Sequence, residues 1–283
     1  AGIDQINTER WKKYYSEQAQ IHHLNFEPHP YRIVFLDIHA MQAEKMIREN
    51  VIDQQSIALT AVKNHNNGKQ NPNAQYRFGA TEEGVLNDRP IVSPFTRAMC
   101  SPVSDGGSAV LLCSEAYKEK LPLDLQQRAI RIDSIGVAGG QYRDINDDNV
   151  TKRAAEKCFS KSDYTPNSID IAEVHDSTAF CELKALVELG LATDDSIKTD
   201  VLTGKFLPTG ELPVNVSGGL ISKGHPLGAT GIGMVVELSK QLRGESLAYQ
   251  VNSNPKVALF QNAGGMIGLD EAVSVVGILS SGG

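Results

Sequence analysis

The chain of 283 residues lacks the features that mark several large protein classes. It has only four cysteines, Cys100, Cys113, Cys158 and Cys181, and none of them forms a C-x-x-C pair. This spacing argues against a zinc site and a disulfide framework, so we expect no bound metal. It fits a reducing, cytoplasmic compartment, with an organellar matrix left open. No apolar run reaches the ~18 residues of a membrane span, and no signal peptide is recognisable.

The charge balance excludes a further class. The chain has 27 Lys and Arg against 34 Asp and Glu, a net charge of −7, and it has no dense basic block. Nucleic acid is therefore not an expected partner, and an anionic ligand would be held by local charges and backbone amides. The composition, 41% hydrophobic and 22% charged, is that of a globular protein with one large or two modest domains.

The second part of the chain alternates between predicted strands and helices. Period-two or continuous apolar runs indicate strands at residues 129–137, 169–174, 257–260 and 272–279. Helical patterns lie at residues 150–159 and 179–191, and another follows a glycine-rich loop, at residues 232–242. This order predicts an α/β fold with a sheet sandwiched between helices, and functional residues on loops at strand ends.

The first 88 residues are polar and weakly periodic. A helical pattern runs from about Ile38 to Lys63, with a break around residues 50–53, and a loop follows at 64–73. We expect this part to be an insertion that lies over a site and contributes little to the core. Residues 101–112 predict a turn that leads into a buried strand, which would place Cys100 and Cys113 in the core.

The most informative stretch is residues 215–231, a glycine-rich loop that presents His225 shortly before a helix. Glycine allows the backbone to approach a ligand closely, and Pro226 stiffens the turn. An imidazole beside a helix N-terminus suits chemistry in which negative charge develops. A lone Gly-His-Pro is common, so these three residues alone would not establish a site.

Four segments in order resemble the thiolases, above all the sterol-carrier-protein-2-type and archaeal acetoacetyl-CoA enzymes. They are Ser104-Asp105-Gly106-Gly107-Ser108-Ala109, Glu173-Val174-His175-Asp176, the Gly-His-Pro loop, and Gln261-Asn262-Ala263-Gly264-Gly265. The resemblance implies helix-sandwiched sheets in two similar halves, with a loop domain inserted in the first. Residues 1–118 would be the remainder of an incomplete N-terminal half, including the loop domain at about 5–88, and residues 119–283 the C-terminal half.

The resemblance also implies the site. The catalytic residues would be His225, His175 and Ser177, and the substrate-binding residues would be Asn215, Gly224, Asn262, Gly264 and Ser104. Two departures stand out. The segment that carries the nucleophilic cysteine of the family is not recognisable here. In addition, Ser177 and Gln261 stand where relatives carry Cys, and His or Cys, and neither side chain transfers protons readily near pH 7.

Plainer interpretations of the same residues stay open. His175 could be a polar cap at a strand end, and Ser177 could be a helix N-cap. Asp176 fits an orienting or capping role better than a proton carrier. We expect Cys181 to be an ordinary core residue.

By this resemblance the complete protein is an acyltransferase that acts on acyl-CoA thioesters in lipid metabolism, by 3-oxoacyl-CoA thiolysis or acetyl-CoA condensation. Coenzyme A would be a substrate, and no cofactor would be bound permanently. One alternative is a degenerate thiolase-like subunit that binds acyl-CoA or an active partner. Another is a thiolase-like carbon–carbon lyase that works with an OB-type chain. We expect a homodimer or such a mixed assembly, since residues 1–283 alone would leave an apolar face uncovered.

Overall fold

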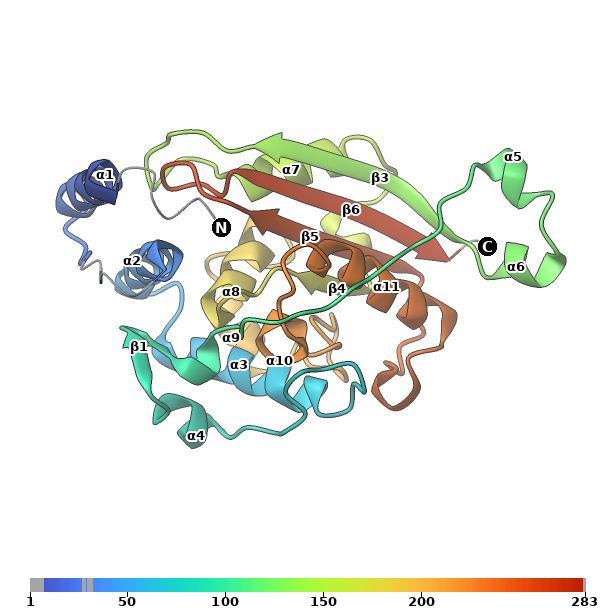
Figure 1. Cartoon of the computed structure of the whole chain (residues 1–283), viewed down its shortest axis with the longest axis horizontal. Coiled ribbons are helices and arrows are strands. Elements are labelled where there is room, and N and C mark those ends of the chain that lie inside the picture. The colour runs from blue at the N-terminus through green and yellow to red at the C-terminus, as the bar shows by residue number, and fades with distance from the viewer. Residues whose placement is uncertain (1–7, 27–28, 30–32, 282–283) are drawn as a thin grey trace.

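A computed structural model describes residues 8–26, 29 and 33–281. Its main sheet has four strands in the order β3-β6-β5-β4 (Figure 1). β4 pairs with β5 in parallel, and the other two pairs are antiparallel. The strands are β3 (Ile130–Gly139), β4 (Ile171–Val174), β5 (Val257–Gly264) and β6 (Val273–Ser281). The predicted α/β fold is confirmed, and each predicted strand of the second part is present.

Helices cover both faces of this sheet, as the alternation predicts. Along β5, Leu259 belongs to a core that contains Leu183, whereas the next residue, Phe260, belongs to a core that contains Leu238. Successive side chains of a strand point to opposite faces, so the two cores lie on opposite sides of the sheet. The first side is covered by α7 (Val150–Phe159) and α8 (Ala179–Glu188), and the second by α11 (Thr230–Arg243).

The strand β3 turns several of its apolar residues outward. Ile135 and Val137 are exposed, whereas Gly136 faces α7, and a bulge lies between residues 132 and 134. A Cβ on Gly136 would come within 2.0 Å of the Ala154 carbonyl oxygen, so the close approach of α7 admits only a small residue there. The apolar side chains of β3 therefore form an uncovered strip.

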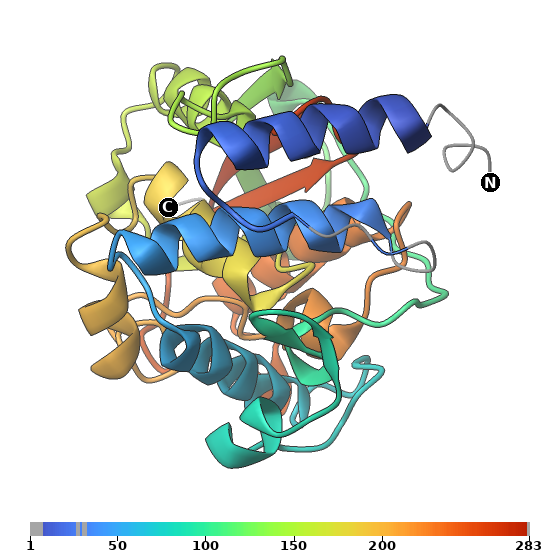
Figure 2. The same ribbon diagram turned by 90° about the vertical axis from the view of Figure 1, so that its left-hand side faces the viewer.

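The N-terminal helices form part of the main core, which corrects the expected position of this region. α2 (Val34–Arg48) and α3 (Gln54–Gly68) are separated by the predicted break, and Asp53 caps α3 by accepting from the Ser56 amide at 2.8 Å. Ile57 and Ala61 of α3 are fully buried in the core that includes α8. α1 (Thr8–Ile21) and α2 pack side by side over one end of the sheet (Figure 2).

Residues 101–127, which we call the arm, differ from the prediction. The expected buried strand at 109–112 is extended chain without strand pairing, and the side chain of Leu111 is fully exposed. Cys113 is exposed, so its predicted core position is wrong, whereas Cys100 is partly buried and packs against the main core. The arm runs across the molecule and ends in α5 (Glu115–Lys118) and α6 (Leu123–Gln127), which project beyond the sheet (Figure 1).

The remaining elements are short. They are α4 (Glu82–Leu86), the ribbon of β1 (Pro90–Val92) and β2 (Phe95–Thr96), α9 (Ile197–Leu202), α10 (Gly219–Lys223), and 3-10 turns at Arg97–Met99, Pro166–Ser168 and Leu247–Tyr249. In the part of the chain that the structure describes, no helix combines the length and apolar character needed to cross a membrane.

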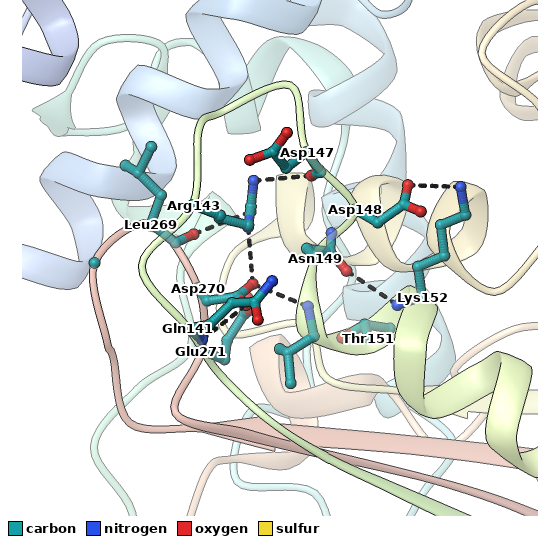
Figure 3. A network of polar contacts seen from close by, with 12 residues as sticks. Gln141, Arg143, Asp147, Asp148, Asn149, Thr151, Lys152, Leu269, Asp270 and Glu271 are labelled. Carbon is teal, nitrogen blue, oxygen red and sulfur yellow. Dashed lines mark hydrogen bonds and ion pairs between the residues drawn. The ribbon is translucent and has the colours of Figure 1, made fainter.

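A buried carboxylate fastens the end of the β5–β6 connection. Asp270 accepts hydrogen bonds from Arg143 Nε at 3.0 Å, from Arg153 Nη2 at 3.0 Å and from the Val150 amide at 2.9 Å (Figure 3). The Val150 amide lies in the first turn of α7, where a negative charge also interacts well with the helix dipole. Asp270 therefore ties the loop after β3, the start of α7 and the β5–β6 connection together.

Candidate active site

The glycine-rich loop is anchored to β4 by Asn215. This residue has a φ of +52°; its Oδ1 accepts from the Val174 amide at 2.8 Å, and its Nδ2 donates to Glu182 Oε2 at 2.8 Å. The side chain is fully buried. The structure therefore places Asn215 beneath the loop as a support, although the resemblance suggests a substrate contact for it.

The turn into α10 depends on Gly219. Asp176 accepts hydrogen bonds from the Leu220 amide at 2.6 Å and the Ile221 amide at 3.4 Å. A Cβ on Gly219 would lie 2.1 Å from Asp176 Oδ2, so a side chain at this position would displace the carboxylate. Burial, followed by the neighbouring Glu182, raises the pKa of Asp176. The expected capping role of Asp176 is confirmed, and the helix it caps is α10.

Ser104 of the arm and Gly224 fix the backbone of His225. The Ser104 hydroxyl accepts from the His225 amide at 3.0 Å and contacts Gln75 Oε1. Gly224 has a φ of +107°, and a Cβ there would come within 2.6 Å of Ser104 Oγ. Both residues predicted to bind substrate therefore also position the histidine.

The imidazole of His225 can serve as a donor or as a base. Its Nδ1 lies 2.8 Å from the hydroxyl of Thr230, and this hydroxyl also lies 3.1 Å from the Pro226 carbonyl oxygen. When the hydroxyl donates to Pro226, it accepts from Nδ1–H and leaves Nε2 as a base. When it donates to Nδ1, Nε2 carries the proton and is a donor. Burial lowers the pKa of His225, which favours these neutral forms.

His175 lies at the end of β4 and meets His225 edge to face, with ring centroids 4.9 Å apart. Burial, and then the proximity of His225, lowers the pKa of His175 to about 3. Its backbone amide donates to Gln261 Oε1 at 3.0 Å. The structure thus brings together the two predicted catalytic histidines as a pair of neutral imidazoles.

The residues of β5 support this pair in different ways. Gln261 is buried, and its Nε2 lies 3.3 Å from the Thr151 hydroxyl, so the whole amide is engaged inside the protein. Asn262 is half-buried beside Gly231, and its Oδ1 has no hydrogen-bond partner in the described part of the chain. Gly264 lies at the exposed end of the strand with open space around it. Of the predicted binding residues on β5, Asn262 thus has a buried oxygen without a hydrogen-bond partner among the described residues.

Ser177 is partly buried at the start of α8. Its hydroxyl donates to Cys181 Sγ at 3.5 Å, and its carbonyl oxygen accepts from the Ser101 amide at 3.0 Å. The N-cap of α8 is the next residue, Thr178, so the interpretation of Ser177 as a plain cap is wrong. Its predicted catalytic role stays a prediction.

A shallow cavity of ≈ 360 Å³ opens next to the histidine pair. Residues 104–108 of the arm and 226–229 of the loop line it, and Ser104 and Pro226 flank His225. Neither histidine lines this cavity itself. Glycine, alanine and serine make up most of its lining, so small residues dominate a surface that lies beside the two histidines.

Sequence reasoning missed Thr230 and Gln75. Thr230 occupies the first position of α11, five residues after His225, and this hydroxyl at a helix start was the available signal. Gln75 follows the polar loop after α3 and carries no local signal, because only the fold brings it to Ser104. Among residues 8–26, 29 and 33–281, no group of three or more His, Cys, Asp or Glu side chains is placed to hold a metal.

Comparison with known proteins agrees with this geometry. Residues 137–278 match the family described as "Thiolase C-terminal domain-like". Acetyl-CoA acetyltransferase of Methanothermobacter thermautotrophicus is 34% identical over 234 residues, which cover 82% of this chain and 61% of that protein. Benzoylsuccinyl-CoA thiolase subunit BbsB of Thauera aromatica is 32% identical over 80% of this chain and 59% of that protein.

Two further similarities extend the comparison. Human sterol carrier protein 2 is 37% identical over 71% of this chain and 38% of that protein. A solved chain titled "Ltp2-ChsH2(DUF35) aldolase" has the same fold, with a TM-score of 0.72 at 19% identity over 87% of this chain and 63% of that chain. The chain thus spans less than two thirds of each of these proteins.

Proposed function

We propose that this chain, which belongs to the thiolase superfamily, supplies the histidine side of an acyltransferase site that acts on acyl-CoA thioesters. The observation that carries the proposal is the neutral pair of His175 and His225 beside a cavity lined mainly by small residues. A neutral imidazole that donates a hydrogen bond suits a thioester, whose carbonyl oxygen becomes negative when a nucleophile attacks.

The proposed reaction needs a thiol from a part of the protein outside these residues. His225 Nε2 takes the proton of that thiol, and the sulfur then attacks the 3-oxo carbon of a 3-oxoacyl-CoA. The carbon–carbon bond breaks, and acetyl-CoA leaves as its enolate, which takes up one proton from an acid of the site. The sulfur of a second CoA then attacks the acyl group, and the proton of its thiol returns to that acid. The thiolate that leaves the acyl group takes its own proton back from His225 Nε2. Until then Nε2–H stabilises the developing oxyanion in both steps, while Nδ1–H donates to the hydroxyl of Thr230.

The test is thiolysis of acetoacetyl-CoA by CoA in the full-length protein that contains this chain. We expect His225→Ala to lower kcat by about 10²- to 10³-fold, the usual cost of losing one oxyanion donor. Leu202→Ala in α9 is the control, since this side chain is half exposed and does not line the cavity. An active enzyme that is indifferent to His225→Ala would exclude this assignment.

A non-catalytic role is the second candidate, and Gln261 favours it. Its amide is fully engaged inside the protein and cannot carry a proton, although relatives place His or Cys at this position. A subunit of this kind would bind acetoacetyl-CoA in calorimetry and give no turnover, whereas the enzyme would do both.

We also infer that the complete protein is an assembly, a homodimer or a complex with another thiolase-like or OB-type chain. The exposed apolar side chains of the arm and of β3 support this, because soluble monomers seldom leave such patches uncovered. Light scattering that gives a strict monomer of the full-length protein at micromolar concentration would argue against it.

A further inference from the structure

A second histidine touches a cysteine next to the catalytic pair. His39 of α2 and Cys181 of α8 meet between the two helices, with His39 Nδ1 3.3 Å from Cys181 Sγ, and both residues are more than nine-tenths buried. The sequence gives no hint of this contact, because 142 residues separate the two. It corrects the expectation that Cys181 is an ordinary core residue.

The sulfur of Cys181 is surrounded by hydrogen-bond donors. The hydroxyl of Thr178 donates to it at 3.2 Å and the hydroxyl of Ser177 donates at 3.5 Å, in addition to the imidazole. A neutral thiol is a weak acceptor, whereas a thiolate accepts several such bonds. Two hydroxyls donate to this buried sulfur, and the imidazole is a third donor when His39 Nδ1 carries a proton, so the arrangement suits the anion.

The charges around the pair are balanced. Lys184 forms ion pairs with Glu271 at 3.0 Å and with Glu188 at 3.4 Å. His175 and Cys100 are further titratable groups that interact with the pair. Burial raises the pKa of Cys181. The charge and hydrogen bond of His39, together with hydrogen bonds from Ser177 and Thr178, lower this pKa overall to about 7. Burial lowers the pKa of His39, but Cys181 raises it overall.

Cys158 is a second buried cysteine, and it allows a comparison because no histidine of the described chain contacts its thiol. Its Sγ lies 3.0 Å from the hydroxyl of Ser134 and is also enclosed in the core. Burial raises the pKa of Cys158 in spite of that hydroxyl. The difference between the two thiols is therefore the imidazole of His39.

Ser177 connects the pair to the candidate active site. It is two residues from His175, and its backbone oxygen holds the Ser101 amide at the start of the arm. Two residues further along the arm, Val103 forms a β-bridge with His225. The same stretch of the arm thus borders both Ser177 and the catalytic histidine.

We propose that Cys181 and His39 form a buried thiolate–imidazolium pair that stores a proton for the site and exchanges it through the hydroxyl of Ser177. This inference rests on the proposed acyltransferase function. Ser177 gives its hydroxyl proton to the enolate and takes one from Cys181, which in turn takes the Nδ1 proton of His39, so the pair is left as a thiolate and a neutral imidazole. The thiol of the second CoA later returns one proton by the same route in reverse, and nothing is oxidised or reduced. In this proposal Ser177 is the group that contacts the substrate. Cys181 and His39 act only through Ser177 and are therefore positioning residues.

The first test needs no turnover. The S–H stretching band of Cys181 is read in the infrared from the difference between the wild-type protein and Cys181→Ala, from about pH 6 to pH 9, which brackets the ordinary thiol pKa of about 8.5. We expect this band to disappear with a midpoint near pH 7. The band of Cys158, read with Cys158→Ala as the matched control, should persist throughout.

Two further measurements separate the pair from a solitary thiol. His39→Gln should raise the midpoint of Cys181 by at least about one pH unit, which is a tenfold change in ionisation. If that variant does not fold, NMR titration of His39 in Cys181→Ala should show its pKa falling once the thiolate is removed. A Cys181 band that persists as long as that of Cys158 would overturn the pair.

The second test asks whether the pair serves the reaction. In acetoacetyl-CoA thiolysis by the full-length protein, Cys181→Ala should lower kcat by about 10²-fold, the usual scale for losing an acid/base. In a Ser177→Cys background, which places a titratable thiol directly at the site, the same change should cost no more than about threefold. A merely structural Cys181 would cost the same in both backgrounds, and that result would overturn the relay.

The two hypotheses fail in different ways. A thiolate seen in the infrared with no thiolysis by the wild-type protein would remove the acyltransferase and leave the pair. Thiolysis that depends on His225, together with a persistent S–H band, would keep the enzyme and remove the pair.

Discussion

The sheet region, residues 130–281, and the arm, residues 101–127, differ in how far they bury their apolar side chains. Leu183 of α8 is fully buried between the sheet and α3, whereas Leu111 of the arm has its whole side chain in solvent. Both leucines lie in apolar segments of similar appearance in the sequence. Burial therefore depends on whether another element of the described chain reaches the segment, and only the sheet region has helices on both faces.

The two histidines of the candidate site lie where these two regions meet. His225 and His175 belong to loops of the sheet region, and Ser104 of the arm holds the His225 backbone. The site thus combines loops of the well-packed sheet region with a segment of the largely exposed arm. The following predictions test this difference, in order of decreasing effect.

The largest effect is expected from Asp270, the buried carboxylate of the β5–β6 connection. Asp270→Ala leaves the buried Arg143 without its partner and releases the start of α7 (Figure 3). Breaking a buried pair in this way costs about 3–5 kcal/mol of the free energy of unfolding. Urea unfolding measures this loss of free energy. The control is Asp148→Ala, which removes an exposed i,i+4 ion pair with Lys152 and should cost less than about 0.5 kcal/mol.

The core of the sheet region comes next. Leu183→Ala leaves a cavity between α8, the sheet and α3, and should lower the free energy of unfolding by about 2–5 kcal/mol. A loss below about 1 kcal/mol in the same urea experiment would mean that this core is loosely packed, and the contrast with the arm would disappear.

The third effect concerns pH and is specific to His175. The pKa of His175 is about 3 in the folded protein against 6.5 ordinarily. Between these values the unfolded chain binds a proton that the folded protein does not. The contribution is fully present above about pH 6.5 and is lost as the pH falls towards 3, by about 2 kcal/mol at pH 5. His175→Gln should therefore flatten the acid side of the stability–pH curve, and parallel curves would contradict the buried neutral imidazole.

The smallest effect on stability is expected in the arm. Leu111→Ala removes a side chain that packs against nothing in the described chain, so the free energy of unfolding should change by less than about 0.5 kcal/mol. The same change should reduce self-association in light scattering, because it shrinks an exposed apolar patch. A loss as large as that of Leu183→Ala would show that the arm is buried in solution.

Sequence reasoning predicted the sheet region well, because its signals are local. The strands, the helix at 150–159 and the loop that presents His225 all follow from periodicity and from glycine and proline. The meeting of His175 and His225 also followed, since loops at the same edge of one sheet converge. The alternation of β3 alone did not decide which of its faces is covered, because a bulge and the close approach of α7 turn Ile135 and Val137 outward.

The arm and the supporting contacts could not be predicted in the same way. An apolar run such as residues 109–112 is typical of a buried strand, yet it is buried only where a partner covers it. The contact between His39 and Cys181 and that between Gln75 and Ser104 each join segments far apart in the sequence. No local pattern records such pairs, since they depend on how α2 and the loop after α3 dock on the sheet region.

The sequence by itself determined the order of elements, the family and the histidine of the glycine-rich loop, because backbone preferences and the spacing of apolar residues act over short distances. Only the tertiary structure decided which face of β3 is covered, that α3 belongs to the core, and that Cys181 meets an imidazole. These outcomes depend on close packing between distant segments, where a single bulge or a missing Cβ decides which side chains touch.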